Sequence, residues 1–595
     1  MNQFRLLKLG EVAGVVRFVM QNPGIMTCEV FDLHARTLLG VLNIPRTPGP
    51  PVAISQVFSW RCTPNEKLVL SLIVALSGFR IPNLLFQRLS QEQRRWTESG
   101  EIRVIMPSDA GLESKYLEVL LPKVGFERLI AELGPCIITQ EGSDNSQELY
   151  YTVRSPLKEE WTEVVKHDQE LAIAALQLVC FSFPRERLWE PQFLSDGRRL
   201  APCLSHTLLR NKNNELPSVV KEAALECLVA KSGLGTAYIS QDDLQEAQAL
   251  LRQGEPVSDY LEAAISHRQS TLARLEAKYQ YSLALSRWCC SSLHCHADKR
   301  LHAWHLHLFV SHLKTLNLQE KFEEAHEKLK QWKMPPMPSL MERQVVTSFS
   351  LVASEIERSL GRLNVAKGYL EDCYSHTLLL GSDSNRFQIV CALIDVRCAL
   401  GELEGAEYLV RDEIKKLGSV GGLSKALRRL QVSSLDVDIA RLSPKSLVDA
   451  HSKIARLVHC FDQMTKLDIS DQLLHVRTLT ASARIYHLQS NHSQAIQQWE
   501  KVKSCAVNYS AFRNKGFTFA FSQLSIGYAY MKVAGTPVSN PYYQQYAQVA
   551  SDNIAEANSV FEKEKDNYWI PLIVTSWLPI IRSEILNWQR LAAFS

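Results

Sequence analysis

Histidines and cysteines gather in one short stretch of the chain, and both residue types are common ligands of zinc. Six of the 17 histidines fall between positions 294 and 312, with three cysteines beside them. They are His294, His296, His302, His305, His307 and His312, with Cys289, Cys290 and Cys295. Helical phase separates the histidines, since His302 and His305 share a face while His307 points elsewhere. No H-E-x-x-H or C-x-x-C spacing closes a site, so we interpret the stretch as a helix face and expect no metal or cofactor.

Other patterns that would predict catalysis or nucleotide binding are absent from the sequence. There is no G-x-S-x-G string for a nucleophile and no G-x-x-x-x-G-K-[ST] string to hold phosphates. The nearest glycine cluster, Gly418–Lys425, lacks the adjacent glycine and lysine. The neighbouring carboxylates Asp436 and Asp438 have no supporting pattern. An enzyme whose fold brings a cysteine and a histidine together stays open as an alternative.

Tryptophans and short basic runs have structural interpretations. Four tryptophans lie at helix-core spacing, and we expect them to fill the core: Trp288, Trp304, Trp332 and Trp499. The basic runs Lys425–Arg429 and Arg94–Arg95 are interpreted as solvated helix faces.

The composition predicts several domains or an extended array. A chain of 595 residues is too long for one hydrophobic core. Apolar residues make up 46% and charged residues 22%, as in ordinary globular proteins. The net charge of +3 excludes a large basic field for nucleic acid at the level of the whole chain.

The N-terminus and the apolar stretches predict a protein of the cell interior. Met1–Leu9 lacks the long apolar core and cleavage site of a signal peptide. The most apolar stretches, Leu68–Phe79 and Ile570–Ile581, are too short to span a bilayer. The 14 cysteines show no framework spacing, which indicates reduced thiols. We expect a cytoplasmic or nuclear protein without a membrane partner.

Residues 1–155 predict mixed structure in two parts. Residues 1–60 combine strand-like alternation with the proline-rich linker Pro45–Pro51. Residues 61–155 predict three helices and then two strands: Glu66–Leu76, Asn83–Leu89, Tyr116–Leu133, Cys136–Gln140 and Leu149–Val153. This order is typical of a winged-helix-like α+β domain. Its third helix, Phe126–Leu133, has one arginine against two glutamates, and its wing, Glu141–Glu148, is acidic, so we do not expect nucleic acid as a partner.

Beyond Pro156 the chain is predicted to be almost entirely helical. Residues 156–300 form a helical connector that starts with a helix over Trp161–Phe181, where apolar residues recur at three-and-four spacing. Short stretches rich in proline or glycine separate the helices at 210–217, 254–256, 333–338 and 535–541.

A short string recurs in the C-terminal half, residues 301–595. Leu360–Leu363 precedes Ala366, and Leu400–Leu403 precedes Ala406, so L-G-x-L-x-x-A repeats after forty residues. The glycine ends one helix in a tight turn, and the alanine lets the next helix pack closely. With three looser copies, the signature residues are Gly361, Ala366, Gly401, Ala406, Ala325, Ala450 and Ala495.

The string resembles the tetratricopeptide repeat (TPR). The steps between successive alanines are 41, 40, 44 and 45, longer than the usual spacing of about 34, which implies longer helices or loops. The predicted fold is therefore mostly α, with a TPR-like helical-repeat (α-solenoid) array preceded by a winged-helix-like domain. An irregular helical bundle with coincidental spacing is the alternative.

The layout of residues 60–595 and several short phrases carry a wider resemblance. The phrases are Ala174–Val179, Phe181–Pro184, Trp189 and Leu200–His206. This order is similar to the C-terminal part of fungal NB-ARC/NACHT-TPR proteins, members of the STAND class of signalling ATPases. The ATPase module is absent, and Val153–Pro156 stands where that family carries a nucleotide-sensing histidine. The resemblance implies a relative that kept the regulatory and partner-binding parts.

These observations predict a non-catalytic scaffold or adaptor that binds a protein partner through a TPR-like groove. One alternative is a regulator of gene expression or of a fungal metabolic pathway that acts through a complex. A second alternative is an unrecognised enzyme with a pocket in the helical array. The sequence leaves the partner and the oligomeric state open.

Overall fold

The structure, a computed structural model, is mostly helical, which confirms the mostly-α prediction. It describes residues 63–594 apart from 77–79, 122, 135–136, 142–148, 154–156, 187–188, 236, 255, 291–296, 333–336, 381–382, 418–423, 442, 514, 536–541 and 563–576. Strands in this part are confined to Ile81–Val153. The strands predicted within residues 1–42, the linker Pro45–Pro51 and most of the wing Glu141–Glu148 lie outside the described residues. No described helix is long and apolar enough to cross a membrane.

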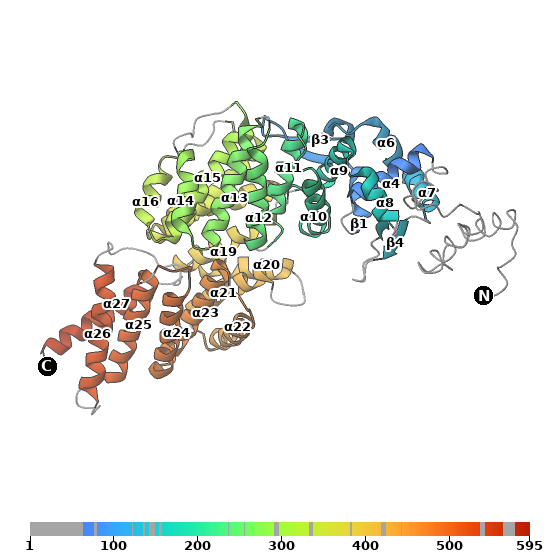
Figure 1. The fold of residues 1–595 in the computed structure, drawn as a ribbon. Helices are drawn as coiled ribbons and strands as arrows, with labels where there is room; N and C mark the ends of the chain where they lie inside the picture. Colours follow the sequence, from blue (N-terminus) through green and yellow to red (C-terminus); the bar gives the residue numbers. More distant parts are fainter. Residues whose placement is uncertain are drawn as a thin grey trace, which may run out of the picture. The chain divides into compact units, whose positions relative to one another are not determined.

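The chain forms two compact units (Figure 1). The first unit holds the described residues up to Arg95 together with Arg103–Leu261, and the second holds 96–102 and the residues from Glu262 onward. The second unit therefore starts well before residue 301, the predicted start of the array.

The first unit begins with helices around a small sheet. Its helices are α4 (Pro64–Leu76), α5 (Leu84–Leu89), α6 (Ser114–Leu120) and α7 (Lys123–Glu132), with a 3-10 turn η2 (Pro107–Ala110). Strands β1 (Ile81–Pro82), β4 (Ile137–Glu141) and β5 (Leu149–Val153) form an antiparallel sheet in the order β1-β5-β4. Tyr151 lies opposite Ile81, and its ring packs against Phe86 and Phe126 with centroids 5.8 and 6.2 Å away. The aromatic contacts join α5 and α7 to the central strand.

A short hairpin lies between α5 and α6, where the sequence pattern predicts no regular element. Strands β2 (Gln93–Trp96) and β3 (Ile102–Ile105) pair with each other. Residues 96–102 at its tip belong to the second unit. There the carbonyl of Glu98 accepts a hydrogen bond from the amide of Lys299 at 2.7 Å, and the carbonyl of Gly100 accepts one from Met341 at 3.0 Å. The tip satisfies first-turn amides of two helices, which have no partner within a helix.

The connector begins with two helices, α8 (Leu157–Val165) and α9 (Gln169–Ser182). Asp168 separates them, and its side chain accepts a hydrogen bond from the amide of Leu171 at 2.9 Å. The prediction of one helix over Trp161–Phe181 is wrong, because the apolar spacing continues across an N-cap that interrupts the backbone. The unit is completed by α10 (Phe193–Arg210), α11 (Ser218–Lys231) and α12 (Ala237–Leu251).

Three arginines bind the C-terminal end of α9. Each guanidinium donates a hydrogen bond to one of three consecutive carbonyls: Arg185 to Cys180 at 2.9 Å, Arg95 to Phe181 at 2.8 Å and Arg88 to Ser182 at 2.6 Å. The last carbonyls of a helix lack partners and carry partial negative charge, so cations stabilise them. The Phe181–Pro184 phrase therefore has a structural role in this chain.

The second unit is an array of helix pairs, which Figure 1 shows from α13 to α27. The pairs are α13 (Asp259–Leu275) with α14 (Tyr279–Cys290), α15 (Lys299–Leu318) with α16 (Phe322–Leu329), α17 (Leu340–Ser359) with α18 (Leu363–Leu380), α19 (Asp383–Ala399) with α20 (Leu403–Leu417), α21 (Lys425–Arg441) with α22 (Pro444–Asp462), α23 (Ile469–Leu488) with α24 (His492–Asn508) and α25 (Phe517–Ala534) with α26 (Tyr543–Phe561), followed by α27 (Trp577–Phe594). From α15 to α23, each first helix contacts the first helix of the next pair, while the described parts of successive second helices scarcely touch. First helices therefore lie on the more tightly curved side of the array.

Residues in the left-handed conformation follow the first helices. Gly361 and Gly401 have φ of 73° and 79°. Ala277, Glu320 and Ser490 occupy the same position in other pairs, with φ between 57° and 59°. A residue other than glycine is strained there by about 1 kcal/mol. The turn is therefore imposed by the packing of the two helices and not only by glycine.

Candidate functional site

Six charged residues occupy one repeated position on six successive first helices, α13 to α23. In chain order they are Arg274, Lys314, Glu355, Asp395, Asp436 and Arg477. Successive members are separated by a nearly constant number of residues along the chain. We term this set the inner row. Gly361 and Gly401 are separated by the same interval, so the row follows the repeat of the helix pairs.

Side chains of the inner row meet across helices that are not neighbours. Arg477 on α23 donates two hydrogen bonds to Asp395 on α19, both at 2.8 Å. It donates a third, also at 2.8 Å, to Asp436 on the intervening helix α21. A side chain can extend past the neighbouring first helix to the first helix beyond it only on the side toward which the array curves. The row therefore lies on the concave face of the array.

One part of the concave face forms a closed network of ion pairs, which we term the paired cluster. Its members are Arg358, Asp395, Asp436, Arg477 and Arg484. Arg358 lies 3.5 Å from Asp395, and Arg484 lies 3.2 Å from Asp436. No side chain in the network is more than 12% exposed.

Both burial and neighbouring charges act on the pKa values of the paired cluster. Burial raises the pKa of Asp395, but Arg477 and Arg358 more than offset it and hold the pKa below its ordinary value. Burial lowers the pKa of Arg477, but Asp395 and Asp436 outweigh burial and raise it. At Asp395 and Arg477 the opposite charges therefore outweigh burial and stabilise the charged forms. Burial outweighs the opposite charges at Asp436, whose pKa is raised, and at Arg358 and Arg484, whose pKa values are lowered.

Elsewhere on the first helices, one carboxylate and three cations influence one another electrostatically. This unpaired cluster consists of Arg274, Lys314, Glu355 and Arg429. Lys314 and Arg429 form no hydrogen bond or ion pair with any residue in the described part of the chain. Burial, Arg274 and Arg429 lower the pKa of Lys314 to about 8, against the opposing effect of Glu355. All three cationic residues are half-buried.

A chain of buried hydroxyls holds Arg274 in position. Its guanidinium donates to the hydroxyl of Ser311 at 2.6 Å. That hydroxyl lies 2.9 Å from the hydroxyl of Ser270, which in turn lies 2.9 Å from that of Ser282. The three serines come from α13, α14 and α15 and are buried. The guanidinium is thus fixed by three helices and keeps donors for a further partner.

Two histidines and a tryptophan lie beside the unpaired cluster. His267 and His307 stand two helical turns before Arg274 and Lys314, on the same face. Their ring centroids are 5.1 Å apart, and Trp304 lies 5.5 and 5.2 Å from them. Burial and then Lys314 lower the pKa of His307 to about 4, and burial with His307 puts that of His267 well below its ordinary value. Both imidazoles are neutral at pH 7, so they add hydrogen-bonding groups without charge.

The structure distributes the histidines of 294–312 over separate contacts. His302 contacts the buried carboxylate of Glu342, and His312 lies 3.0 Å from the hydroxyl of Ser286. His305 is buried on the same helix, while the ring of His307 lies beside that of His267. His294, His296, Cys295 and the side chains of Cys289 and Cys290 lie outside the described residues. Among the residues that are described, no group of three or more His, Cys, Asp or Glu could hold a metal ion.

The interpretation of the basic runs as solvated helix faces is wrong for two arginines. Arg428 is 8% exposed and pairs with Asp471 at 2.9 Å. Arg95 is bound to the end of α9. Both acceptors lie far away in sequence, where helical phase gives no information. The adjacent Arg429 belongs to the unpaired cluster.

Carboxylates and tryptophans singled out in the sequence have structural contacts. Asp436 belongs to the paired cluster, and Asp438 pairs with Lys453 at 2.5 Å. Trp499 is fully buried, and Trp332 stacks on Phe349 with centroids 3.9 Å apart. The side chain of Trp288 and the glycine cluster 418–423 lie outside the described residues.

The small residues of the repeat signature are all buried. Ala325, Ala366, Ala406, Ala450 and Ala495 are each 0% exposed. Most of them stand five residues after the left-handed residue of their pair, as Ala366 does after Gly361 and Ala406 after Gly401. Ser282, five residues after Ala277, occupies this place in the pair α13–α14 and is also fully buried. The repeat pattern therefore begins one helix pair before residue 301.

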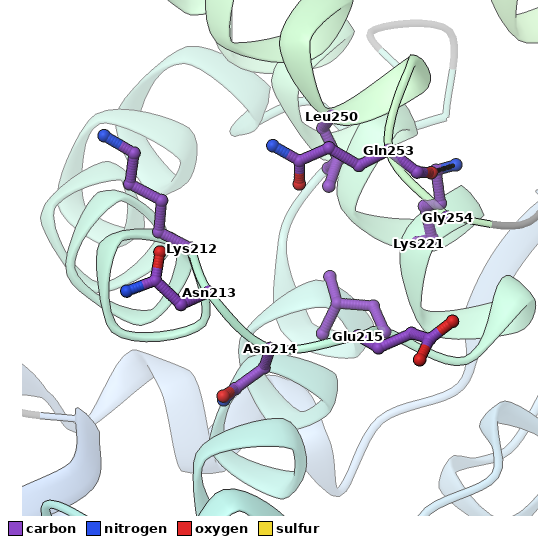
Figure 2. A pocket seen from close by; sticks show the side chains of 9 residues that line it. Lys212, Asn213, Asn214, Glu215, Lys221, Leu250, Gln253 and Gly254 are labelled. Atoms are coloured by element: carbon purple, nitrogen blue, oxygen red, sulfur yellow. Dashed lines mark hydrogen bonds between the residues drawn. The ribbon is translucent and has the colours of Figure 1, made fainter.

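A cavity of about 340 Å³ in the first unit is the other candidate site (Figure 2). It lies between the segment Lys212–Leu216, the helix α11 and the end of α12. Lys221, one of its lining residues, donates a hydrogen bond to the carbonyl of Leu251 at 3.3 Å and so caps α12. The lining contains no cysteine, histidine or aspartate. The cavity is explained by helix ends, and the inner row is the stronger candidate.

Sequence reasoning missed the inner row although its period is present in the printed sequence. The glycines and alanines of the recurring string indicate the turns, and charged residues recur at the same period. The electrostatic effect of Arg429 on Lys314 has no local signal, because the two residues lie far apart in the sequence.

No model of a known protein family matches this chain, and no curated protein matches it in sequence.

Proposed function

We propose that this chain is a non-catalytic interaction protein whose TPR-like array binds a partner along its concave face. In this proposal the N-terminal α+β segment is a winged helix with a structural role. The chain is then a relative of the NB-ARC/NACHT-TPR proteins that functions without their ATPase module. The resemblance of the sequence phrases and the repeated helix pairs support this reading.

The inner row is the observation that carries the proposal. For packing alone an apolar shared face would be less costly, because buried charged groups need compensating partners such as those in the paired cluster. Instead, charged side chains recur at one position over six helices. Half-buried cations remain on this face, with donors free for a ligand. A repeated polar face on the inside of a solenoid is the usual form of a partner-binding surface.

A quantitative pull-down from the protein's own cell extract tests the proposal. The bait is the tagged full-length chain, compared with the double variant Lys314→Glu and Arg429→Glu. The matched control is Lys330→Glu, because Lys330 is exposed at the end of α16 and pairs with the nearby Glu327. We expect a partner that the wild type and the control enrich equally and that the double variant loses. A partner set unchanged by the double variant, with the variant folded by circular dichroism, would contradict binding at the concave face.

The pull-down and an activity assay of the purified chain distinguish the alternatives. Enrichment of transcription or pathway components that the double variant loses would identify the complex in which the chain acts. Enzymatic turnover of a substrate by the purified chain alone would contradict a non-catalytic role.

A further inference from the structure

Helix pairs near the two ends of the array contact each other, although they lie far apart in the sequence. The hydroxyl of Tyr279, at the start of α14, donates a hydrogen bond to the carbonyl of Ser510, just after α24, at 2.9 Å. The amide of Phe517, at the start of α25, donates one to the carboxylate of Glu320, between α15 and α16, at 3.0 Å. These hydrogen bonds span 231 and 197 residues. The first two helix pairs therefore meet the sixth and seventh.

An aromatic contact joins the same two regions. The rings of Phe322, the first residue of α16, and Phe517 stack with centroids 6.0 Å apart. Phe322 is 5% exposed and Phe517 is 4% exposed. Both belong to one core cluster with residues of α23 and α25, such as Val476 and Phe521. We term the five contacting residues the clasp: Tyr279, Glu320, Phe322, Ser510 and Phe517.

The clasp joins the array across its concave side. First helices lie on the more tightly curved side, so helix pairs five steps apart meet only where the array curves back on itself toward that side. The paired cluster lies on the intervening first helices and α23, and none of its side chains is more than 12% exposed. This part of the inner row is therefore shielded while the clasp is closed.

We propose that the clasp is a reversible closure of the concave face that opens to admit the partner. The proposal rests on the function proposed above, because it concerns access to the same face. The hydrogen bond of Tyr279 is exposed to solvent, and that of Phe517 is partly exposed. The loss of one such bond changes the population of an open form by only about fivefold. Most of the core around Phe517 comes from α23 to α27, so these helices keep their packing when the clasp opens.

A close approach at Gly516 provides one way to open the clasp. Gly516 immediately precedes Phe517, and a methyl group there would collide with the carboxylate of Glu320. The φ of Gly516 is −82°, which alanine also adopts. Gly516→Ala should therefore displace the carboxylate from the amide of Phe517 without any change at residue 320.

A double variant removes both hydrogen bonds of the clasp. Tyr279→Phe removes the donor, and Glu320→Asn shortens the acceptor while tolerating the left-handed backbone at that position. The matched control is Tyr281→Phe with Ser490→Asn. Tyr281 is 53% exposed on the same helix as Tyr279, and Ser490 is an exposed residue with a left-handed φ of 57° in another pair.

Alkylation of native thiols in the full-length protein measures opening without any partner. Cys398 is a free thiol, 4% exposed, and stands one helical turn after Asp395 on the same face of α19. Cys373 on α18 is free, 2% exposed and part of the same core cluster as Cys398, so it reports loss of helix packing. Iodoacetamide labels the thiols, and peptide mass spectrometry resolves each rate.

We expect both ways of opening the clasp to expose Cys398 selectively. The double variant should alkylate Cys398 about tenfold faster than the wild type, and Gly516→Ala about fivefold faster. Cys373 should keep its wild-type rate in both, and the control variant should match the wild type at both thiols. In the pull-down described above, the double variant should enrich the same partner several-fold more than the wild type.

Three results would overturn the inference. Unchanged alkylation of Cys398 in the double variant and in Gly516→Ala would show that the clasp does not control access to the concave face. Equal acceleration at Cys398 and Cys373 would show that the changes unfold helix pairs. Equal or lower enrichment of the partner by the double variant would show that opening does not admit it. If no partner is found at all, the proposed function fails, while the thiol rates still decide the clasp.

Discussion

The paired and unpaired clusters occupy the same face of the same repeat, and they manage charge in opposite ways. In the paired cluster, Arg477 contacts two carboxylates at 2.8 Å, and every member has an ion pair. In the unpaired cluster, Lys314 has no ion pair among the described residues and has two guanidiniums nearby. A buried charge without a partner is costly. The difference indicates that one cluster holds the helices together while the other is suited to a ligand.

The contrast comes from a change of residue type at one repeated position. Asp395 and Asp436 stand where Arg274 and Lys314 stand in earlier helices. Carboxylates there can contact Arg477 because the array curves toward it, whereas Lys314 there is under the electrostatic influence of Arg429. The same curvature therefore closes a network in one part and concentrates like charge in the other.

The largest expected change in the free energy of unfolding comes from breaking the paired cluster. Arg477→Met keeps much of the apolar volume but leaves Asp395 and Asp436 buried without their shared partner. We expect the free energy of unfolding to fall by about 3–5 kcal/mol, as for other buried pairs broken on one side. Urea unfolding measures this loss.

The control for Arg477→Met is Arg411→Met on α20. Arg411 is 75% exposed and pairs with Glu407, one helical turn away. Its replacement should change stability by no more than about 0.5 kcal/mol. A loss below about 1 kcal/mol for Arg477→Met would show that water already solvates the cluster.

In the unpaired cluster, the removal of one charge is expected to raise the free energy of unfolding. Lys314→Met removes a half-buried cation that Arg274 and Arg429 repel, and the methionine fills similar space. We expect the ligand-free protein to gain on the order of 1 kcal/mol in stability, the typical gain from relieving a strained functional position. Urea unfolding beside Lys330→Met, a change at an exposed lysine, measures it. A loss of similar size would mean that the aliphatic stem of Lys314 is essential for packing.

The pH dependence of stability should locate this effect at Lys314. Its pKa is about 8 in the folded chain, because of burial, Arg274 and Arg429 against Glu355, and about 10.4 in an unfolded chain. Between these values the unfolded chain binds more protons, so stability should rise with pH. The penalty is fully present below about pH 8 and relieved above about pH 10.4. His307, with a pKa of about 4, does not titrate in this window.

Urea midpoints of the wild type and Lys314→Met at about pH 7 and about pH 10 test this dependence. The difference between the two proteins should shrink at the higher pH. A constant difference would show that the charge of Lys314 is not its cause.

Long periodic helices and their turns could be predicted from the sequence. Gly361 and Gly401 adopt the left-handed conformation, and Ala366 and Ala406 are fully buried behind them. Glu320 adopts the same backbone conformation without glycine. It could not be predicted, because the two helices on either side force the turn on whatever residue is present.

The candidate site was less accessible to sequence reasoning, although part of it was visible. A nearly constant period connects Glu355, Asp395 and Asp436 in the printed sequence. The contact of Arg477 with Asp395 spans 82 residues, and only the curvature of the array brings them together. Arg428 and Arg429 are neighbours in one basic run, yet Arg428 pairs with Asp471, while the charge of Arg429 lowers the pKa of Lys314.

The smallest expected effect is that salt changes the stability contributions of the two clusters to different extents. Ions screen exposed and half-buried charges far more than buried pairs. Raising sodium chloride from about 0.05 M to about 0.5 M should therefore relieve repulsion around Lys314 and stabilise the wild type by a few tenths of a kcal/mol relative to Lys314→Met. The penalty of Arg477→Met should stay nearly constant, because the side chains of Asp395 and Asp436 are only 7% and 5% exposed. Urea midpoints at both salt concentrations measure the two trends, and a larger salt effect on the Arg477→Met penalty would reverse the assignment of which cluster solvent reaches.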